Sequence, residues 1–197
     1  MGRQLGLYIH IPFCKSKCDY CDFYSLPERE ARMDAYQKAL LAHLKETAPQ
    51  AKGYLVDTVY FGGGTPSFYG EKRLRELLSA VKKRFEVAGN AEISLEANPD
   101  SVDKKSMVRL RRAGVNRVSL GMQSAHDDEL EALHRAHTWQ QTRQAVAAIR
   151  EANSGYYDFY LALHSNAIGN GSAQTSARGI IAFYYPGSAG GQRGAEL

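Results

Sequence analysis

Strand-like and helix-like segments alternate along the first 152 residues of this 197-residue chain, and this alternation is the strongest constraint on its fold. The strand-like runs are short and rich in β-branched and aromatic residues, whereas the helix-like segments repeat apolar residues at helical spacing. We expect strands at 5–11, 55–61, 92–96 and 115–120 and helices at 27–47, 71–85, 101–113, 127–134 and 138–152, with Ser101 as an N-cap. The pattern predicts βα units and a parallel sheet, an α/β fold.

Polar, glycine-rich or cysteine-bearing loops follow all four predicted strands. In a parallel sheet the carboxyl ends of the strands share one edge, and both barrels and open sheets bind ligands there. We therefore expect these four loops to build one ligand site.

The only cysteines of the chain, Cys14, Cys18 and Cys21, lie within eight residues in the first of these loops. An odd number of clustered cysteines indicates metal ligation rather than a disulfide framework. Three thiolates are too few for a closed four-thiolate zinc site, whereas a four-iron cluster held by three cysteines keeps one iron open for another ligand. A loop of free or zinc-binding thiols is the alternative.

Further motifs accompany the cysteines. They are Tyr8-Ile-His-Ile-Pro-Phe before them, Phe61-Gly-Gly-Gly-Thr-Pro-Ser67, Ser94-Leu-Glu-Ala-Asn-Pro-Asp100, Ser119-Leu-Gly-Met-Gln-Ser124 and His134-Arg135. In this order and spacing they resemble the oxygen-independent coproporphyrinogen III oxidase-like family of the radical S-adenosylmethionine (SAM) superfamily, over residues 5–152. The resemblance implies the N-terminal part of a (β/α)6 partial TIM-like barrel.

The resemblance also implies a cofactor site. It assigns a [4Fe-4S] cluster to Cys14, Cys18 and Cys21, with SAM bound at the open iron, and it assigns no catalytic side chain. The implied SAM contacts are Tyr8, Tyr20, Gly63, Gly64, Thr65, Glu96, Gln123 and Arg135. Glycines allow close backbone approach, and carboxylate, amide and guanidinium groups suit a zwitterionic ligand.

Each of these residue types also has an ordinary structural explanation. The glycine run is compatible with a tight turn, Glu96 with a solvated carboxylate, Arg135 with a helix-surface charge and Tyr8 with a core position. The cysteine motif upstream favours the cofactor interpretation.

Within the family, the run from Cys18 to Ser25 resembles HemW-type members, which act mainly as haem chaperones. The porphyrinogen-oxidising members carry a fourth cysteine where this chain has Phe23, and a long N-terminal extension. The implied partners are SAM, haem or a porphyrin, and an electron donor such as a flavodoxin or ferredoxin. The alternatives are a coproporphyrinogen III oxidase in porphyrin biosynthesis, a zinc- or thiol-binding module and a non-functional fragment.

The composition changes near residue 153. Residues 153–197 hold 8 of the 18 glycines and 5 of the 12 tyrosines, but only two acids and two bases. We expect a truncated radical SAM core domain at 1–152 and, at 153–197, an irregular low-charge tail in which strand–helix alternation stops, most simply an out-of-frame product. Strand 115–120 would then form an apolar sheet edge. A glycine-rich extension and a partner-binding appendage are the alternatives.

The sequence also indicates location. No run of about 18 apolar residues predicts a membrane-spanning helix. The N-terminal residues lack an apolar signal-peptide region, which predicts a cytoplasmic chain. The formal charge of +4 is mild and spread along the sequence, so it does not indicate a nucleic-acid partner.

Overall fold

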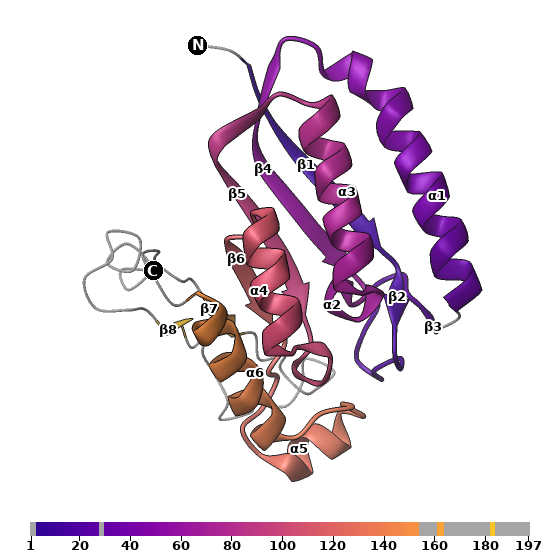
Figure 1. Cartoon of the computed structure of the whole chain (residues 1–197). Coiled ribbons are helices and arrows are strands. Elements are labelled where there is room, and N and C mark those ends of the chain that lie inside the picture. The colour runs from indigo at the N-terminus through magenta and orange to yellow at the C-terminus, as the bar shows by residue number, and fades with distance from the viewer. Residues whose placement is uncertain (1–2, 28–29, 154–160, 164–181, 184–197) are drawn as a thin grey trace.

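The computed structural model describes residues 3–27, 30–153, 161–163 and 182–183 (Figure 1). In this part of the chain the main sheet has six strands in the order β1-β4-β5-β6-β7-β8. The first five run parallel, and β8 is antiparallel to β7. Their bounds are β1 (Arg3–Ile11), β4 (Tyr54–Gly63), β5 (Val87–Ala97), β6 (Arg117–Leu120), β7 (Leu161–Leu163) and β8 (Ala182–Phe183). The parallel strands follow chain order, as in a segment of a barrel, and the predicted α/β partial-barrel fold is confirmed.

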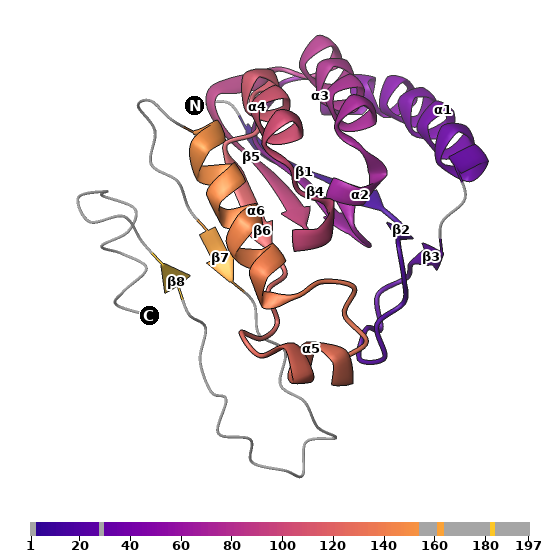
Figure 2. The same ribbon diagram turned by 60° about the horizontal axis from the view of Figure 1, so that its bottom comes forward.

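Four long helices connect these strands and lie in the same order over one face of the sheet (Figure 2). They are α1 (Glu30–Thr47), α3 (Glu71–Arg84), α4 (Lys104–Ala113) and α6 (Trp139–Ala152). Shorter turns lie between them: η1 (Ala48–Ala51), α2 (Pro66–Tyr69), η2 (Pro99–Ser101) and α5 (Asp127–Ala132). None of the helices described is both long enough and apolar enough to cross a membrane.

The core lies between this helix layer and the sheet. In α3 the side chains of Leu74, Leu77, Leu78 and Val81 are almost fully buried, which is the apolar stripe that the helical spacing predicted. They belong to the same cluster as the buried side chains of the strands.

A buried aromatic group anchors the segment that enters the cysteine loop. The rings of Phe13 and Tyr69 stack with centroids 5.5 Å apart, and neither side chain is exposed to more than 1%. The Tyr69 hydroxyl donates to the Gln37 side-chain oxygen on α1 at 2.8 Å, so its polar end is satisfied inside the core. Residue 13 is thus fixed against both α1 and α2 immediately before the first cysteine.

The beginning of α4 differs from the sequence prediction. The N-cap is Asp103, whose carboxylate accepts a hydrogen bond from the Ser106 N–H at 3.0 Å. Ser101 lies in η2, where its hydroxyl donates to the Asn98 carbonyl at 2.9 Å. The predicted N-cap is therefore wrong, because a contact within the preceding turn occupies the Ser101 side chain.

The segment after α6 also differs from the prediction. β7 pairs in parallel with β6, with Ser119 opposite Ala162, so β6 is not an edge of the sheet. The prediction that strand–helix alternation stops at residue 152 is wrong over Leu161–Leu163. Apart from β7 and β8, the predicted irregular tail lies outside the described residues.

Gly64 marks the closest approach between the end of β4 and the chain entering the cysteine loop. Its N–H donates to the Ile11 carbonyl at 2.8 Å, and the Thr65 N–H donates to the Phe13 carbonyl at 2.7 Å. A Cβ on Gly64 would lie 2.8 Å from the Phe13 oxygen and 2.9 Å from the Ile11 oxygen, closer than Cβ atoms come to other atoms in folded proteins. Both obstacles are backbone atoms, which cannot rotate away.

We predict that Gly64→Ala lowers the free energy of unfolding by about 1–3 kcal/mol, the usual cost of overpacking a tight site. Urea denaturation of the full chain measures this change. Gly89→Ala is the matched control, because a Cβ there meets no atom within 4 Å, and it should change stability by no more than about 0.5 kcal/mol. Equal effects of the two substitutions would contradict the close approach at Gly64.

Candidate functional site

The cysteine loop is closed at its base by a short parallel pair of strands. β2 (Phe13–Cys14) pairs with β3 (Leu26–Pro27), and the Leu26 N–H donates to the Pro12 carbonyl at 2.6 Å. Within the loop, the Cys21 N–H donates to the Cys18 carbonyl at 3.1 Å. All three cysteines are free thiols of intermediate exposure. The loop is thus held at both ends while its thiols remain accessible.

One cavity of about 720 Å³ lies between this loop and the carboxyl ends of β4, β5 and β6. Its volume falls in the range of small-molecule sites. Its wall contains residues from all four loops named by the sequence analysis, including Cys14, Cys18, Tyr20, Cys21, Gly63, Gly64, Thr65, Glu96, Gln123 and Arg135. The structure thus brings the four loops together around one cavity, and their expected role as one ligand site stays a prediction.

Tyr8 is the only implied SAM contact that does not line this cavity. Its side chain is 60% exposed, which excludes the core position. The Tyr8 ring stacks on that of Tyr60 with centroids 6.0 Å apart, and Tyr60 does line the cavity. A direct SAM contact of Tyr8 stays a prediction.

Glu96 is not a solvated carboxylate. The Tyr60 hydroxyl donates to one oxygen at 2.7 Å, and the Gly63 N–H donates to the other at 3.0 Å. Burial raises the pKa of Tyr60 well above its usual range, and the hydrogen bond to Glu96 raises it further. Tyr60 therefore stays a neutral donor that holds the Glu96 side chain in place.

The backbone N–H groups of the glycine run are already hydrogen-bonded within the protein. Those of Gly63, Gly64 and Thr65 donate to Glu96, Ile11 and Phe13 respectively. The Thr65 carbonyl accepts from the N–H groups of Phe68 and Tyr69. The carbonyl oxygens of Gly63 and Gly64 are therefore the backbone groups of this run that suit a ligand ammonium group.

Arg135 reaches the cysteine loop from the connection between α5 and α6, so it is not a helix-surface charge. The preceding His134 has a φ of 51°, which is rare outside glycine and redirects the chain. One terminal nitrogen of Arg135 donates to Cys18 Sγ at 3.5 Å and to the Tyr20 hydroxyl at 3.3 Å. The other donates to Asn98 Oδ1 at 2.9 Å and to the Gly121 carbonyl at 3.0 Å.

The neighbouring Tyr20 is a neutral phenol at ordinary pH. Burial raises the pKa of Tyr20 to about 12, outweighing the opposite effect of the Arg135 charge. Its ring therefore adds a polar but uncharged surface beside Cys18.

Gln123 carries two signs of a ligand-binding position. Its φ is 63°, an unfavourable conformation for a residue with a side chain. Its Oε1 atom is buried and has no hydrogen-bond partner among the described residues. Because buried acceptors are normally satisfied, this oxygen suits a hydroxyl or amino group of a ligand in the cavity.

The donor set fits an iron–sulfur cluster. The Thr65 hydroxyl donates to Cys14 Sγ at 3.4 Å, and Arg135 donates to Cys18 Sγ, so two of the sulfurs have hydrogen-bond donors of the kind that tune a bound cluster. The sequence holds no fourth cysteine. Among the described residues, no three His, Cys, Asp or Glu side chains are arranged to hold a single metal ion. Three thiols that share one cavity, two of them with hydrogen-bond donors, suit a cluster held by three cysteines.

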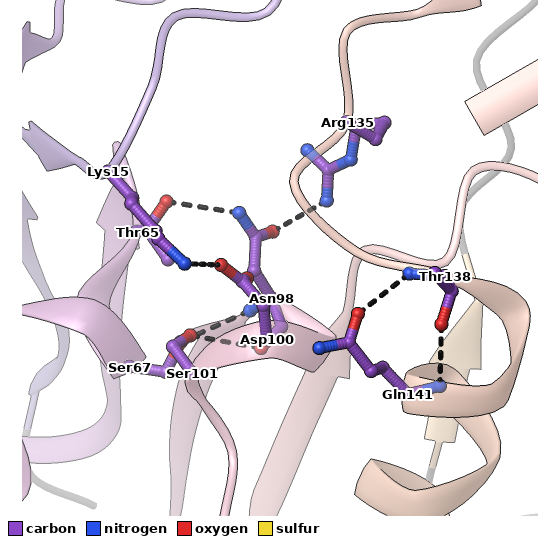
Figure 3. Close-up of polar contacts among 9 residues, drawn as sticks. All are labelled: Lys15, Thr65, Ser67, Asn98, Asp100, Ser101, Arg135, Thr138 and Gln141. Atoms are coloured by element: carbon purple, nitrogen blue, oxygen red, sulfur yellow. Dashed lines mark hydrogen bonds and ion pairs between the residues drawn. The ribbon is translucent and has the colours of Figure 1, made fainter. Parts of the chain in front are cut away.

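Tyr60 and Asn98 are among the residues of the cavity wall that were not assigned from the sequence. Tyr60 holds Glu96, and Asn98 lies between Thr65 and Arg135 (Figure 3). Asn98 belongs to the motif after the third predicted strand, so its position at the cavity could have been anticipated, but its partners come from distant segments.

Comparison with known proteins agrees with this geometry. Residues 8–166 match the model of the family described as the radical SAM superfamily, a match that extends past residue 152 and includes β7. The "Heme chaperone HemW" of Escherichia coli (strain K12) is 43% identical over 143 residues, covering 72% of this chain and 38% of that protein. The protein of the same name from Mycobacterium tuberculosis (strain CDC 1551 / Oshkosh) is 42% identical over 154 residues, covering 77% of this chain and 39% of that protein.

A solved structure gives the same picture. The coproporphyrinogen III oxidase (HemN) from Escherichia coli, described as a radical SAM enzyme, superposes with a TM-score of 0.74 at 28% identity. The match covers 82% of this chain and 37% of that one. The chain therefore spans less than two fifths of the length of these relatives.

Proposed function

The chain belongs to the radical SAM superfamily, and on that premise we propose that Cys14, Cys18 and Cys21 hold a [4Fe-4S] cluster whose open iron binds SAM. The observation that carries this proposal is that all three thiols share one cavity with Arg135, which donates to Cys18. When bound and reduced, such a cluster supplies one electron to the sulfonium group of SAM.

The cavity residues bind and orient SAM in this proposal. The carbonyl oxygens of Gly63 and Gly64 accept hydrogen bonds from the SAM ammonium, since the N–H groups of both residues are already used. Gln123 Oε1 accepts from a SAM hydroxyl or amino group, which satisfies its buried oxygen. We assign the SAM contacts to Tyr8, Tyr20, Gly63, Gly64, Thr65, Glu96, Gln123 and Arg135.

We infer that the longer parent protein binds and delivers haem and receives electrons from a donor such as a flavodoxin or ferredoxin. Identity of 42–43% to two proteins named heme chaperone HemW, against 28% to the oxidase, supports this role. Phe23 also supports it, because this exposed residue at the cavity stands where the oxidases carry a fourth cysteine. Free thiols suit a reducing compartment, and we place the protein in the cytoplasm.

Cluster loading tests the ligand assignment. We predict that Cys18→Ala loses most of the iron and sulfide that the unaltered chain binds after anaerobic reconstitution, because two thiolates cannot replace three. Iron and sulfide analysis, together with the absorbance of the cluster, measures the loss. Ser16→Ala, in the same loop, is the matched control and should load normally. Equal iron content in the Cys18 variant and the control would reject the assignment.

The choice between haem and coproporphyrinogen III tests the proposed haem role. We predict that the cluster-loaded chain binds haem, seen as a saturable change in the Soret absorbance during titration. We also predict that it does not convert coproporphyrinogen III when SAM and a chemical reductant are supplied. Product formation followed by chromatography would contradict the haem role. A Soret band unchanged by the protein would show that the residues of this chain do not by themselves bind haem.

A further inference from the structure

Asn98 occupies a position that the cofactor assignment does not explain. It lies directly after β5, and its side-chain amide is located between Thr65 and Arg135 (Figure 3). These two residues are the ones that donate hydrogen bonds to cluster cysteines, Thr65 to Cys14 and Arg135 to Cys18. One amide therefore contacts both donors.

Hydrogen-bond chemistry fixes the orientation of this amide. A guanidinium has only donors, so the Asn98 oxygen must face Arg135, at 2.9 Å. The Asn98 NH2 group then faces Thr65 Oγ1, at 3.3 Å. Because the Thr65 oxygen accepts this bond, its single proton is available for Cys14 Sγ, at 3.4 Å. The chain of donors runs in one direction, from Asn98 through Thr65 to the sulfur.

The Asn98 backbone is held firmly enough to position its side chain. Its N–H donates to the Ser67 hydroxyl at 3.1 Å, and its carbonyl accepts from the Ser101 hydroxyl at 2.9 Å. The two serine oxygens lie 2.5 Å apart. Asp100, whose side chain is only 6% exposed, forms an ion pair of 3.4 Å with Lys15, the residue after Cys14. This turn is thus tied to α2 and to the cysteine loop.

We propose that Asn98 is a positioning residue that sets the hydrogen bonds to two cluster cysteines and thereby raises the reduction potential of the cluster. Hydrogen bonds to cluster sulfurs and nearby charge both tune that potential. The inference rests on the proposed cluster. Asn98 has no hydrogen bond to a cysteine and acts on the cluster through Thr65 and Arg135, which it contacts directly.

Asn98→Asp is the sharpest test because it preserves shape. The introduced carboxylate still accepts from Arg135 but cannot donate to Thr65. The Thr65 hydroxyl then donates to the carboxylate and no longer to Cys14, and a negative charge is added. We expect the midpoint potential of the cluster, measured by a redox titration followed by electron paramagnetic resonance, to shift to more negative values, with iron content unchanged.

Two further variants separate positioning from general damage. Thr65→Val removes the hydrogen bond to Cys14 without adding charge, so it should also lower the potential, and Asn98→Asp should have a smaller effect in its background. Ser101→Ala is the matched control, because Ser101 supports the same turn without touching Thr65 or Arg135, and it should leave the potential unchanged. If Asn98→Asp fails to load a cluster, the midpoint potential of the Thr65→Val variant becomes the test. An unchanged potential in that variant would overturn the proposal.

The outcomes distinguish this inference from the proposed function. If the unaltered chain loads a cluster but Asn98→Asp or Thr65→Val has the same midpoint potential as the unaltered chain, the role of Asn98 is overturned. The cluster assignment would then remain intact. An equal shift in Ser101→Ala also overturns it, since the effect would then come from the turn as a whole. An unaltered chain that binds no cluster overturns both proposals.

Discussion

The backbone pairing between the end of β4 and the segment before Cys14 is the contact on which the site depends. Two backbone hydrogen bonds, from the Gly64 N–H to the Ile11 carbonyl and from the Thr65 N–H to the Phe13 carbonyl, continue the parallel β1–β4 pairing past the ends of these strands. They place the glycine run against the cysteine loop and leave no space for a Cβ at Gly64. Because they use the N–H groups of Gly64 and Thr65, these two groups cannot donate to a ligand.

Polar contacts between residues distant in sequence also hold the cavity wall together. Arg135 returns to the cysteine loop from beyond β6, and its donors bind Cys18, Tyr20, Asn98 and Gly121. A guanidinium that meets several acceptors at once is well suited to fix segments far apart in sequence. The Cys14 and Cys18 sulfurs are therefore joined through Thr65, Asn98 and Arg135 in one polar network.

Local patterns in the sequence were sufficient to predict the βα elements. Each long helix buries an apolar stripe, as α3 does, and each central strand buries an apolar run. The motif resemblance identified residues that line the cavity, except Tyr8, which stacks on the cavity residue Tyr60 instead. What failed depends on distant contacts. Ser101 is not a cap because its hydroxyl donates to the Asn98 carbonyl and also contacts Ser67. The position of Asn98 between Thr65 and Arg135 depends on segments that are distant in sequence. β7 is three residues long, too short for a periodic signal.

We propose that one cavity brings the three cysteines and a SAM site together. The most direct test is the electron paramagnetic resonance spectrum of the anaerobically reconstituted and reduced full chain, recorded with and without SAM. We predict a four-iron cluster signal that changes when SAM is added, because the open iron faces the ligand. A cluster signal that SAM leaves unchanged, or no cluster at all, would contradict the account.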